Sequence, residues 1–230
     1  VKAVNPEAYI VARFDHANLN NKRHFDVFCE GDPLTDWDFN RGVMGYARSF
    51  THVNVDDPVR VPRSNSILVP QESEENLAKI MASVILAGVP YIAVDFWRTP
   101  EDNLDIIKSY LGFYNEHLDG LVDGEWRPLS FDPAATTLRI ENRESAYLGF
   151  FGVPPAKTRL TKPFKEAYIF NGMESEDFAT TITNQKGRYK ITMFDRHLRP
   201  LETRETTAKN GHLSLDVRLA EGAMAKLQKT

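Results

Sequence analysis

The order of patterns along the chain predicts an α/β region followed by an all-β region. Up to about residue 124, apolar runs alternate with segments of helical periodicity. After Gly124, short β-rich runs are separated by Gly, Pro, Asn and Asp turn signals. We therefore expect four βα units over residues 1–124, a number compatible with half of a (β/α)8-type barrel. An antiparallel β-sandwich should follow over residues 125–230.

Four apolar runs predict the strands of the first region. They are Ala8–Phe14, Phe25–Cys29, Ser66–Val69 and Tyr91–Phe96. Each run is followed by polar residues, and ligand sites in α/β folds lie at the C-terminal ends of the strands. Four such units are half of an eightfold barrel, but they are also enough for a small open sheet. The pattern is compatible with both arrangements.

Three helices are predicted between and after these strands. Thr35 has the character of an N-cap for a helix that runs to about Phe50. The acids at 72–75 begin a second helix, which Gly88 ends. Thr99 is the expected cap of a third helix, because a proline and two acids follow it.

Five β-rich runs predict strands of the sandwich. They are Thr137–Ile140, Tyr147–Phe151, Glu166–Phe170, Arg188–Phe194 and His212–Val217. Their aromatic residues are expected in the core between the two sheets; these are Tyr168, Phe170, Tyr189 and Phe194.

Composition narrows the classes of function. The chain has 42% apolar and 26% charged residues and a net charge of -4, which argues against a nucleic-acid partner. No apolar run reaches the roughly 20 residues that span a bilayer. Cys29 is the only cysteine and the six histidines lack metal-site spacing, so neither a metal nor an organic cofactor is expected. The cellular compartment stays open. The chain begins at Val1, directly before a predicted strand, and we expect a piece of a longer protein.

The segment after the second predicted strand holds the densest candidate chemistry. From Phe25 it reads F-D-V-F-C-E-G-D-P-L-T-D-W-D-F-N-R. Carboxylates can transfer protons or bind hydroxyl groups, and aromatic faces can stack on sugar rings. Glu30 and Asp32 alternate along an extended chain, so their side chains can face the same side. The alternative is a polar strand-to-helix loop whose acids are solvated.

These patterns give two sets of candidate site residues. Asp32 is the candidate general acid, with Glu30 as the alternative. Residues expected to contact a substrate follow three of the predicted strands; they are Asp15, His16, Asp36, Trp37, Arg41, Asp95 and Trp97. For each, an ordinary structural role is the competing interpretation: a turn for the acids, core packing for Trp37 and a surface ion pair for Arg41.

A parallel barrel whose last helix leads into a C-terminal β-sandwich resembles the melibiase-like retaining α-glycosidases, the family of the α-galactosidases. The best local match is L-A-G-V-P-Y-I-A-V-D at 86–95, which is similar to the last helix and strand of their barrel. The helical segment 100–117 and the segment 121–129 resemble their final helix and the entry into the sandwich. The C-E-G-D-P segment at 29–33 looks like the acidic end of a late barrel strand.

The resemblance implies part of a glycoside hydrolase that cleaves α-glycosidic bonds with retention. The four units would then be barrel strands five to eight, and Asp32 or Glu30 would be the acid/base carboxylate. The family's nucleophile would lie upstream of Val1, so the partner of this chain is the upstream half of the barrel, and the piece would be inactive alone. Self-association is also expected, because half of a barrel exposes strand edges.

Two other functions remain compatible with the sequence. One is a non-catalytic carbohydrate-binding or scaffold protein in which the sandwich contributes to binding. The other is a stand-alone α/β domain fused to a sandwich, with a role in protein interaction.

Overall fold

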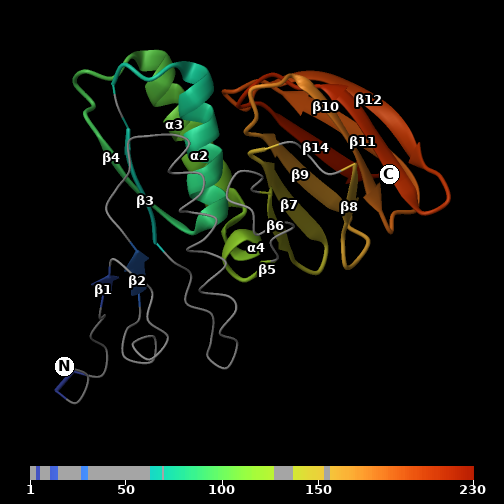
Figure 1. Cartoon of the computed structure of the whole chain (residues 1–230), viewed down its shortest axis with the longest axis horizontal. Coiled ribbons are helices and arrows are strands. Elements are labelled where there is room, and N and C mark those ends of the chain that lie inside the picture. The colour runs from blue at the N-terminus through green and yellow to red at the C-terminus, as the bar shows by residue number, and fades with distance from the viewer. Residues whose placement is uncertain are drawn as a thin grey trace.

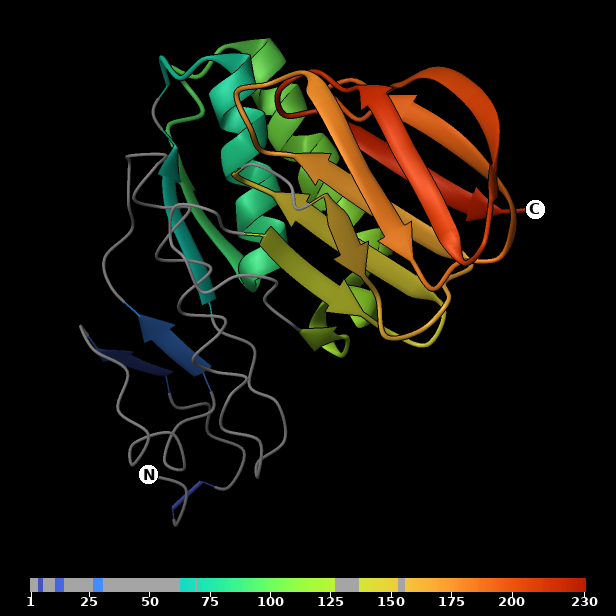
Figure 2. The same ribbon diagram turned by 45° about the vertical axis from the view of Figure 1, so that its right-hand side comes forward.

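The parallel strands of the α/β region form one side of the molecule and the β-sandwich forms the other, and the long helices of the α/β region lie between them (Figures 1 and 2). The structure is a computed structural model. It describes residues 4–5, 11–14, 27–30, 63–68, 70–126, 137–152 and 156–230, with side chains left out at 11–14, 27–30, 63–67 and 126. Among the described residues, no helix is long and apolar enough to cross a bilayer.

The described strands of the α/β region form two parallel pairs. Strand β1 (Val11–Phe14) pairs with β2 (Val27–Glu30), and β3 (Arg63–Leu68) pairs with β4 (Val89–Val94). All four predicted strands are therefore confirmed, with shifts of a few residues at their ends. In the described part of the chain the two pairs form separate sheets, and no closed barrel is formed.

Two long helices follow β3 and β4, as predicted. Helix α2 (Glu74–Ala87) begins at Ser73, whose hydroxyl accepts a hydrogen bond from Asn76 N, and helix α3 covers Glu101–Glu116. The short helix α4 (Leu118–Val122) completes the region. The prediction that Thr99 caps α3 is wrong, because its hydroxyl donates to the carbonyl of Asp95 at 2.7 Å instead. The helix predicted at 35–50 lies outside the described residues.

The sandwich consists of one large and one small sheet. The seven-stranded sheet has the order β12-β11-β14-β9-β7-β6-β5, and the three-stranded sheet has the order β13-β10-β8. The strands are β5 (Glu125–Trp126), β6 (Thr137–Glu141), β7 (Ser145–Phe150), β8 (Lys157–Arg159), β9 (Glu166–Asn171), β10 (Asp177–Thr183), β11 (Gly187–Phe194), β12 (Pro200–Ala208), β13 (His212–Arg218) and β14 (Met224–Lys229).

The prediction of a purely antiparallel sandwich is wrong at two places. Strand β7 pairs with β9, and β8 with β10, in parallel register, whereas the other pairs are antiparallel. Each parallel pair requires a crossover connection instead of a tight hairpin, and turn signals alone do not reveal such a connection. Five of the ten described strands, including β14 in the interior of the large sheet, were not predicted.

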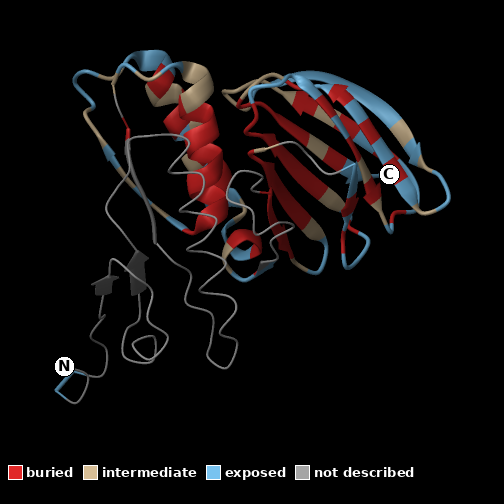
Figure 3. Cartoon of the chain, in the orientation of Figure 1, coloured by how far each residue is buried: buried red, intermediate tan, exposed pale blue. Residues whose placement is uncertain are grey.

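Two hydrophobic cores lie on opposite faces of the seven-stranded sheet. Leu148 and Ile169 pack between the two sheets, and Tyr147 and Phe170 pack against α2 and α3. Both faces of β7 and β9 are therefore buried, as the red strands of Figure 3 show. The expectation that Tyr168, Phe170 and Phe194 lie in the sandwich core is wrong, because these side chains face the helices; Tyr189 does lie between the sheets.

Helix α2 is buried on almost every side, although its sequence predicts a single apolar face. Every residue from Leu77 to Ala87 is buried, including Lys79, whose ammonium lies 3.0 Å from the Glu221 carboxylate. Small side chains permit this close packing. A Cβ atom on Gly222 would come within 2.5 Å of the Ala78 side chain, so only glycine fits there.

Candidate functional site

The connection from β4 to α3 presents uncovered aromatic side chains at the C-terminal end of a strand. After β4 ends at Val94, Phe96 is 68% exposed and Trp97 is 98% exposed. A packed Trp side chain buries about 150–250 Å², so Trp97 offers nearly its whole indole surface to a ligand. This loop, residues 95–99, is called the aromatic loop below.

Hydrogen bonds hold the aromatic loop in a compact turn. The Asp95 carbonyl accepts from Arg98 N at 3.2 Å and from Thr99 N at 3.0 Å. The Asp95 carboxylate also accepts from Trp97 N at 3.2 Å. These bonds fix the backbone of Trp97, although its side chain is exposed. A backbone that is already ordered loses less conformational entropy when a ligand binds.

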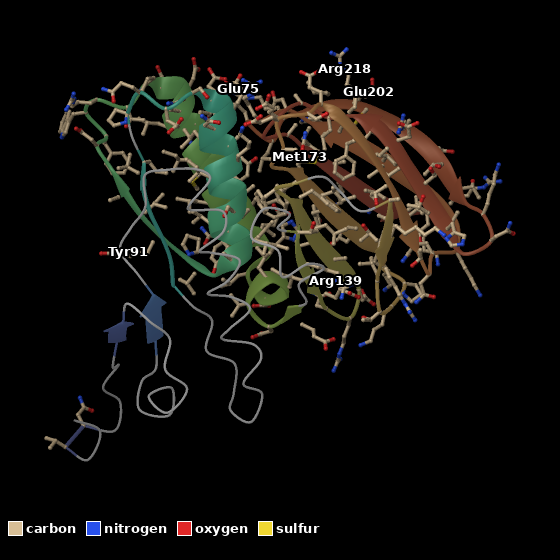
Figure 4. The ribbon with its side chains drawn as sticks, in the orientation of Figure 1. Glu75, Tyr91, Arg139, Met173, Glu202 and Arg218 are labelled. Carbon is tan, nitrogen blue, oxygen red and sulfur yellow. The ribbon has the colours of Figure 1, made fainter. Side chains whose placement is uncertain are left out.

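The face of β4 that lies below the aromatic loop is also apolar and uncovered. Ile92 and Val94 pack toward the helices, whereas Val89, Tyr91 and Ala93 point the other way and are exposed. Tyr91 is 55% exposed, and Figure 4 shows it directed away from α2. In a closed barrel this face of the strand would point into the packed interior.

The first parallel pair brings two of the predicted clusters to one edge. Phe14 and Glu30, the last residues of β1 and β2, are paired in register. The segments that begin at Asp15 and Gly31 thus leave from adjacent strand ends. Glu30 is the last residue of β2, and the placement of its side chain is not described. Asp15, His16, Asp32, Asp36, Trp37 and Arg41 all lie outside the described residues.

Of the predicted site residues, Asp95 and Trp97 are therefore the two that the structure describes in full. It places both on the aromatic loop. Phe96 lies between these two residues in the same predicted strand-end segment, whereas no substrate role was expected for Tyr91. The alternation of β4 contained the signal for Tyr91, because a strand covered by helices on one side only must expose every second residue.

A cluster of ionisable side chains lies near the other end of α3. Tyr147 stacks on Tyr168 with 5.4 Å between the ring centroids, and the Tyr147 hydroxyl lies 3.4 Å from His117 Nδ1. Lys226 Nζ lies 3.1 Å from the Glu166 carboxylate and 5.1 Å from the centre of the Tyr168 ring. These groups satisfy one another, so the cluster binds α3 to the sheet and leaves no group directed at a ligand.

Burial and charge shift the pKa values in this cluster. Burial lowers the pKa of His117 and raises those of Tyr147 and Tyr168. Burial opposes ionisation of Glu166 as well, but the hydrogen bond and charge of Lys226 outweigh it and lower the pKa of that carboxyl. A cavity of about 480 Å³ opens beside Glu166 between the ends of three strands. Two of its lining charges pair with each other, with Lys165 Nζ 2.5 Å from the Glu144 carboxylate.

Asp95 uses one carboxylate oxygen to close its turn. Within the described ranges, no group of three His, Cys, Asp or Glu side chains is arranged to hold a metal ion. The exposed indole of Trp97, on a turn closed by hydrogen bonds, has the shape and surface to stack on a ring.

Comparison with known proteins shows similarity of fold to glycoside hydrolases. No family model matches the chain, and no curated protein matches it by sequence. An α-amylase from Anoxybacillus matches over 100% of this chain and 54% of its own, with a TM-score of 0.60 and 10% identity. An α-amylase from Geobacillus thermoleovorans, solved in complex with acarbose, matches over 100% and 55% with a TM-score of 0.59 and 12% identity.

A third similar structure is also that of a glycoside hydrolase. It is a GH27 β-L-arabinopyranosidase from Geobacillus stearothermophilus, which matches over 93% of this chain and 48% of its own, with a TM-score of 0.53 and 10% identity. The chain thus spans about half the length of these enzymes. At such identities the likeness concerns the fold, a mixed α/β region followed by β-sheets.

Proposed function

We propose that this chain is the C-terminal part of a glycoside hydrolase and that the aromatic loop binds a sugar ring of the substrate. The observation that carries the proposal is the nearly complete exposure of Trp97 at the C-terminal end of β4, in a chain whose whole length matches glycosidase folds. In α/β barrels that end of the strands carries the active site. An indole face suits the apolar face of a pyranose ring.

The proposed reaction is hydrolysis of an α-glycosidic bond with retention. Asp32 is the proposed acid/base group, with Glu30 as the alternative, and the nucleophile comes from the upstream half of the barrel. A retaining enzyme needs its two carboxyl groups about 5–5.5 Å apart. Two features support this choice: β1 and β2 end side by side, and Glu30 is the last residue of β2, with Asp32 two residues further along the chain. Asp15, His16, Asp36, Trp37, Arg41 and Asp95 are proposed to contact the substrate around them.

The proposed upstream half of the barrel would also cover the exposed face of β4. Val89 and Tyr91 are 44% and 55% exposed in this chain. Burying this apolar face in a barrel interior would stabilise the whole enzyme by about 25 cal/mol per Å² removed from water. The proposed boundary between barrel and sandwich lies at residues 124/125, after α4.

The test uses the parent enzyme with substrates of two kinds. Asp32→Asn should slow hydrolysis of glycosides with poor leaving groups by about 100-fold or more, because they need a proton from the acid. The same variant should slow the hydrolysis of activated aryl glycosides far less, because their leaving groups need little protonation. Equal losses on both substrates would assign Asp32 a structural role. Asp36→Asn is the matched control, because it changes a nearby acid that is proposed only to bind substrate.

The alternative function is carbohydrate binding without hydrolysis, which the aromatic loop alone would support. Trp97→Ala should weaken binding of maltotriose or an α-galactoside about tenfold, the size of one stacking contact of about 1.4 kcal/mol. Calorimetric titration measures this change, with Leu201→Ala as the control, because Leu201 is similarly exposed but lies on β12 of the sandwich. Binding that needs Trp97, in a parent protein that hydrolyses no glycoside, would favour the non-catalytic function. Binding that is unaffected by Trp97→Ala would contradict the role of the aromatic loop in both.

A further inference from the structure

A turn of the sandwich lies against the first turns of helices α2 and α3. Residues 195–199 connect β11 to β12. The Asp195 carboxylate accepts hydrogen bonds from His197 N at 2.9 Å and from Arg199 N at 2.8 Å. Leu198, with φ 58°, packs against the hydrophobic core of the helices. The turn is thus ordered by its own bonds and presents its basic side chains in a fixed direction.

The first contact of this turn is with the start of α2. The Arg196 guanidinium forms an ion pair with Glu75, and its Nη1 lies 3.7 Å from the Glu74 carboxylate. Glu75 lies near the N-terminal end of α2, at the top of the helix in Figure 4. A hydrogen bond with its own backbone, together with Arg196, lowers the pKa of the Glu75 carboxyl. The Glu75 carboxylate is therefore an anion at neutral pH.

The second contact is with α3. The imidazole of His197 lies between two carboxylates, with Nε2 3.5 Å from Glu74 and Nδ1 3.3 Å from Asp105. Arg199 also reaches Asp105, at 2.5 Å. The side chain of His197 is only 12% exposed, so it fills the space between the two helices. Three basic side chains of the turn thus meet three acidic side chains of α2 and α3.

This contact is coupled to the aromatic loop through the backbone. Asp105 lies one helical turn after Glu101, where α3 begins, and the first hydrogen bond of the helix joins Leu104 N to the Pro100 carbonyl at 3.0 Å. The aromatic loop ends at the residue before Pro100. The buried Asn103 side chain donates to the carbonyl of Glu72 at 3.0 Å and so ties the starts of the two helices together.

We propose that the turn 195–199 positions the aromatic loop, and through it Trp97, by fixing the first turns of α2 and α3. Arg196, His197 and Arg199 are positioning residues, because they act on the acids of the helices and not on a substrate. The sandwich then helps to order the proposed site, although none of these three side chains contacts the substrate. The consequence for sugar binding rests on the proposed function; the mechanical coupling does not.

Hydrogen–deuterium exchange of the 230-residue chain tests the coupling without any sugar. The triple variant Arg196→Gln/His197→Gln/Arg199→Gln should exchange about tenfold faster at the amides of 98–105, as expected when several partly buried ion pairs are lost. Exchange in β10, which touches neither helix, should stay unchanged. The single variant His197→Gln should give about a threefold effect over the same residues and serves if the triple variant does not fold.

Arg218→Gln is the matched control, because Arg218 forms an exposed ion pair with Glu176, 2.7 Å away, on the sandwich alone. It should leave exchange at 98–105 unchanged. Faster exchange confined to 195–199, or spread evenly over the chain, would overturn the proposal. If the coupling holds but Trp97→Ala does not affect sugar binding, the proposed function fails and the positioning role of the turn stands.

Discussion

The seven-stranded sheet and strand β4 differ in how many of their faces are covered. Along β9, Tyr168 faces the helices and Ile169 faces the second sheet, and both are buried. Along β4, Ile92 packs toward the helices, but its neighbour Tyr91 is 55% exposed. The helices and the sandwich therefore form a complete hydrophobic structure within this chain, whereas β4 presents an apolar face of the kind that normally contacts another protein segment.

The largest expected difference is between two phenylalanines. Phe170 is fully buried between sheet and helices, and Phe96 is 68% exposed on the aromatic loop. Phe170→Ala should lower the free energy of unfolding by about 3–5 kcal/mol, and Phe96→Ala should change it by less than about 0.5 kcal/mol. Urea denaturation measures both. Similar values for the two variants would show that the core beneath the helices is not well packed.

Two glycines separate backbone strain from close packing between the helices and the sandwich. Gly222 has φ 72° and Gly211 has φ 80°, but only Gly222 would place a Cβ atom against the Ala78 side chain. Gly211→Ala should cost about 1–2 kcal/mol for the left-handed backbone alone. Gly222→Ala should cost about 1–3 kcal/mol more, because α2 must move. Equal losses in thermal unfolding would mean that α2 can move at little cost.

A smaller effect on the free energy of unfolding is expected from the titration of His117, at the C-terminal end of α3. Burial lowers the pKa of His117 below its ordinary value of 6.5, so the folded state binds this proton less tightly than the unfolded state. The free energy of unfolding should therefore fall as the pH decreases from 6.5 toward the lower pKa of the folded state. His117→Gln should make that fall less steep. The lowered pKa of Glu166 acts separately, because its contribution is lost only below about 4.5.

A series of urea denaturations across this pH range measures the slope of each protein. An unchanged slope in His117→Gln would assign the pH dependence to other groups. Lys226→Met is a useful second variant, because it removes the partner that lowers the pKa of Glu166 and should alter the slope below about pH 4.5. The Lys226 charge also helps to lower the pKa of His117, so the same variant should make the fall below pH 6.5 less steep.

Local patterns predicted the strands and helices well where one element covers one face of another. The apolar face and acidic start of α2 gave its position within two residues. The same reasoning did not predict β14 or the second buried face of β9, because burial on both sides removes the alternation that marks a strand. The parallel pair of β7 and β9 also depends on contacts between distant segments, which spacing along the chain does not reveal.

The candidate site was predictable in kind but only partly in its residues. Polar residues after an apolar run identified the position of Asp95 and Trp97, since strand ends carry ligands in α/β folds. The 98% exposure of Trp97 could be learned only from the structure, because the sequence does not show which aromatic side chains pack in a core. The contact of His197 with Glu74 and Asp105 could not be predicted, because it joins segments about 90 or more residues apart.

The smallest effect on stability, and the most direct test of the uncovered face, is expected for Tyr91→Lys. Because Tyr91 points away from the helices, this variant should change the free energy of unfolding of the isolated chain by less than about 0.5 kcal/mol. The added charge should nevertheless reduce self-association through β4, which sedimentation velocity measures over a range of concentrations. In the parent enzyme the same change should be strongly destabilising, since the lysine would lie inside the proposed barrel. A mild effect in both proteins would mean that β4 stays uncovered in the parent, and the upstream half of a barrel would then have to be abandoned as its partner.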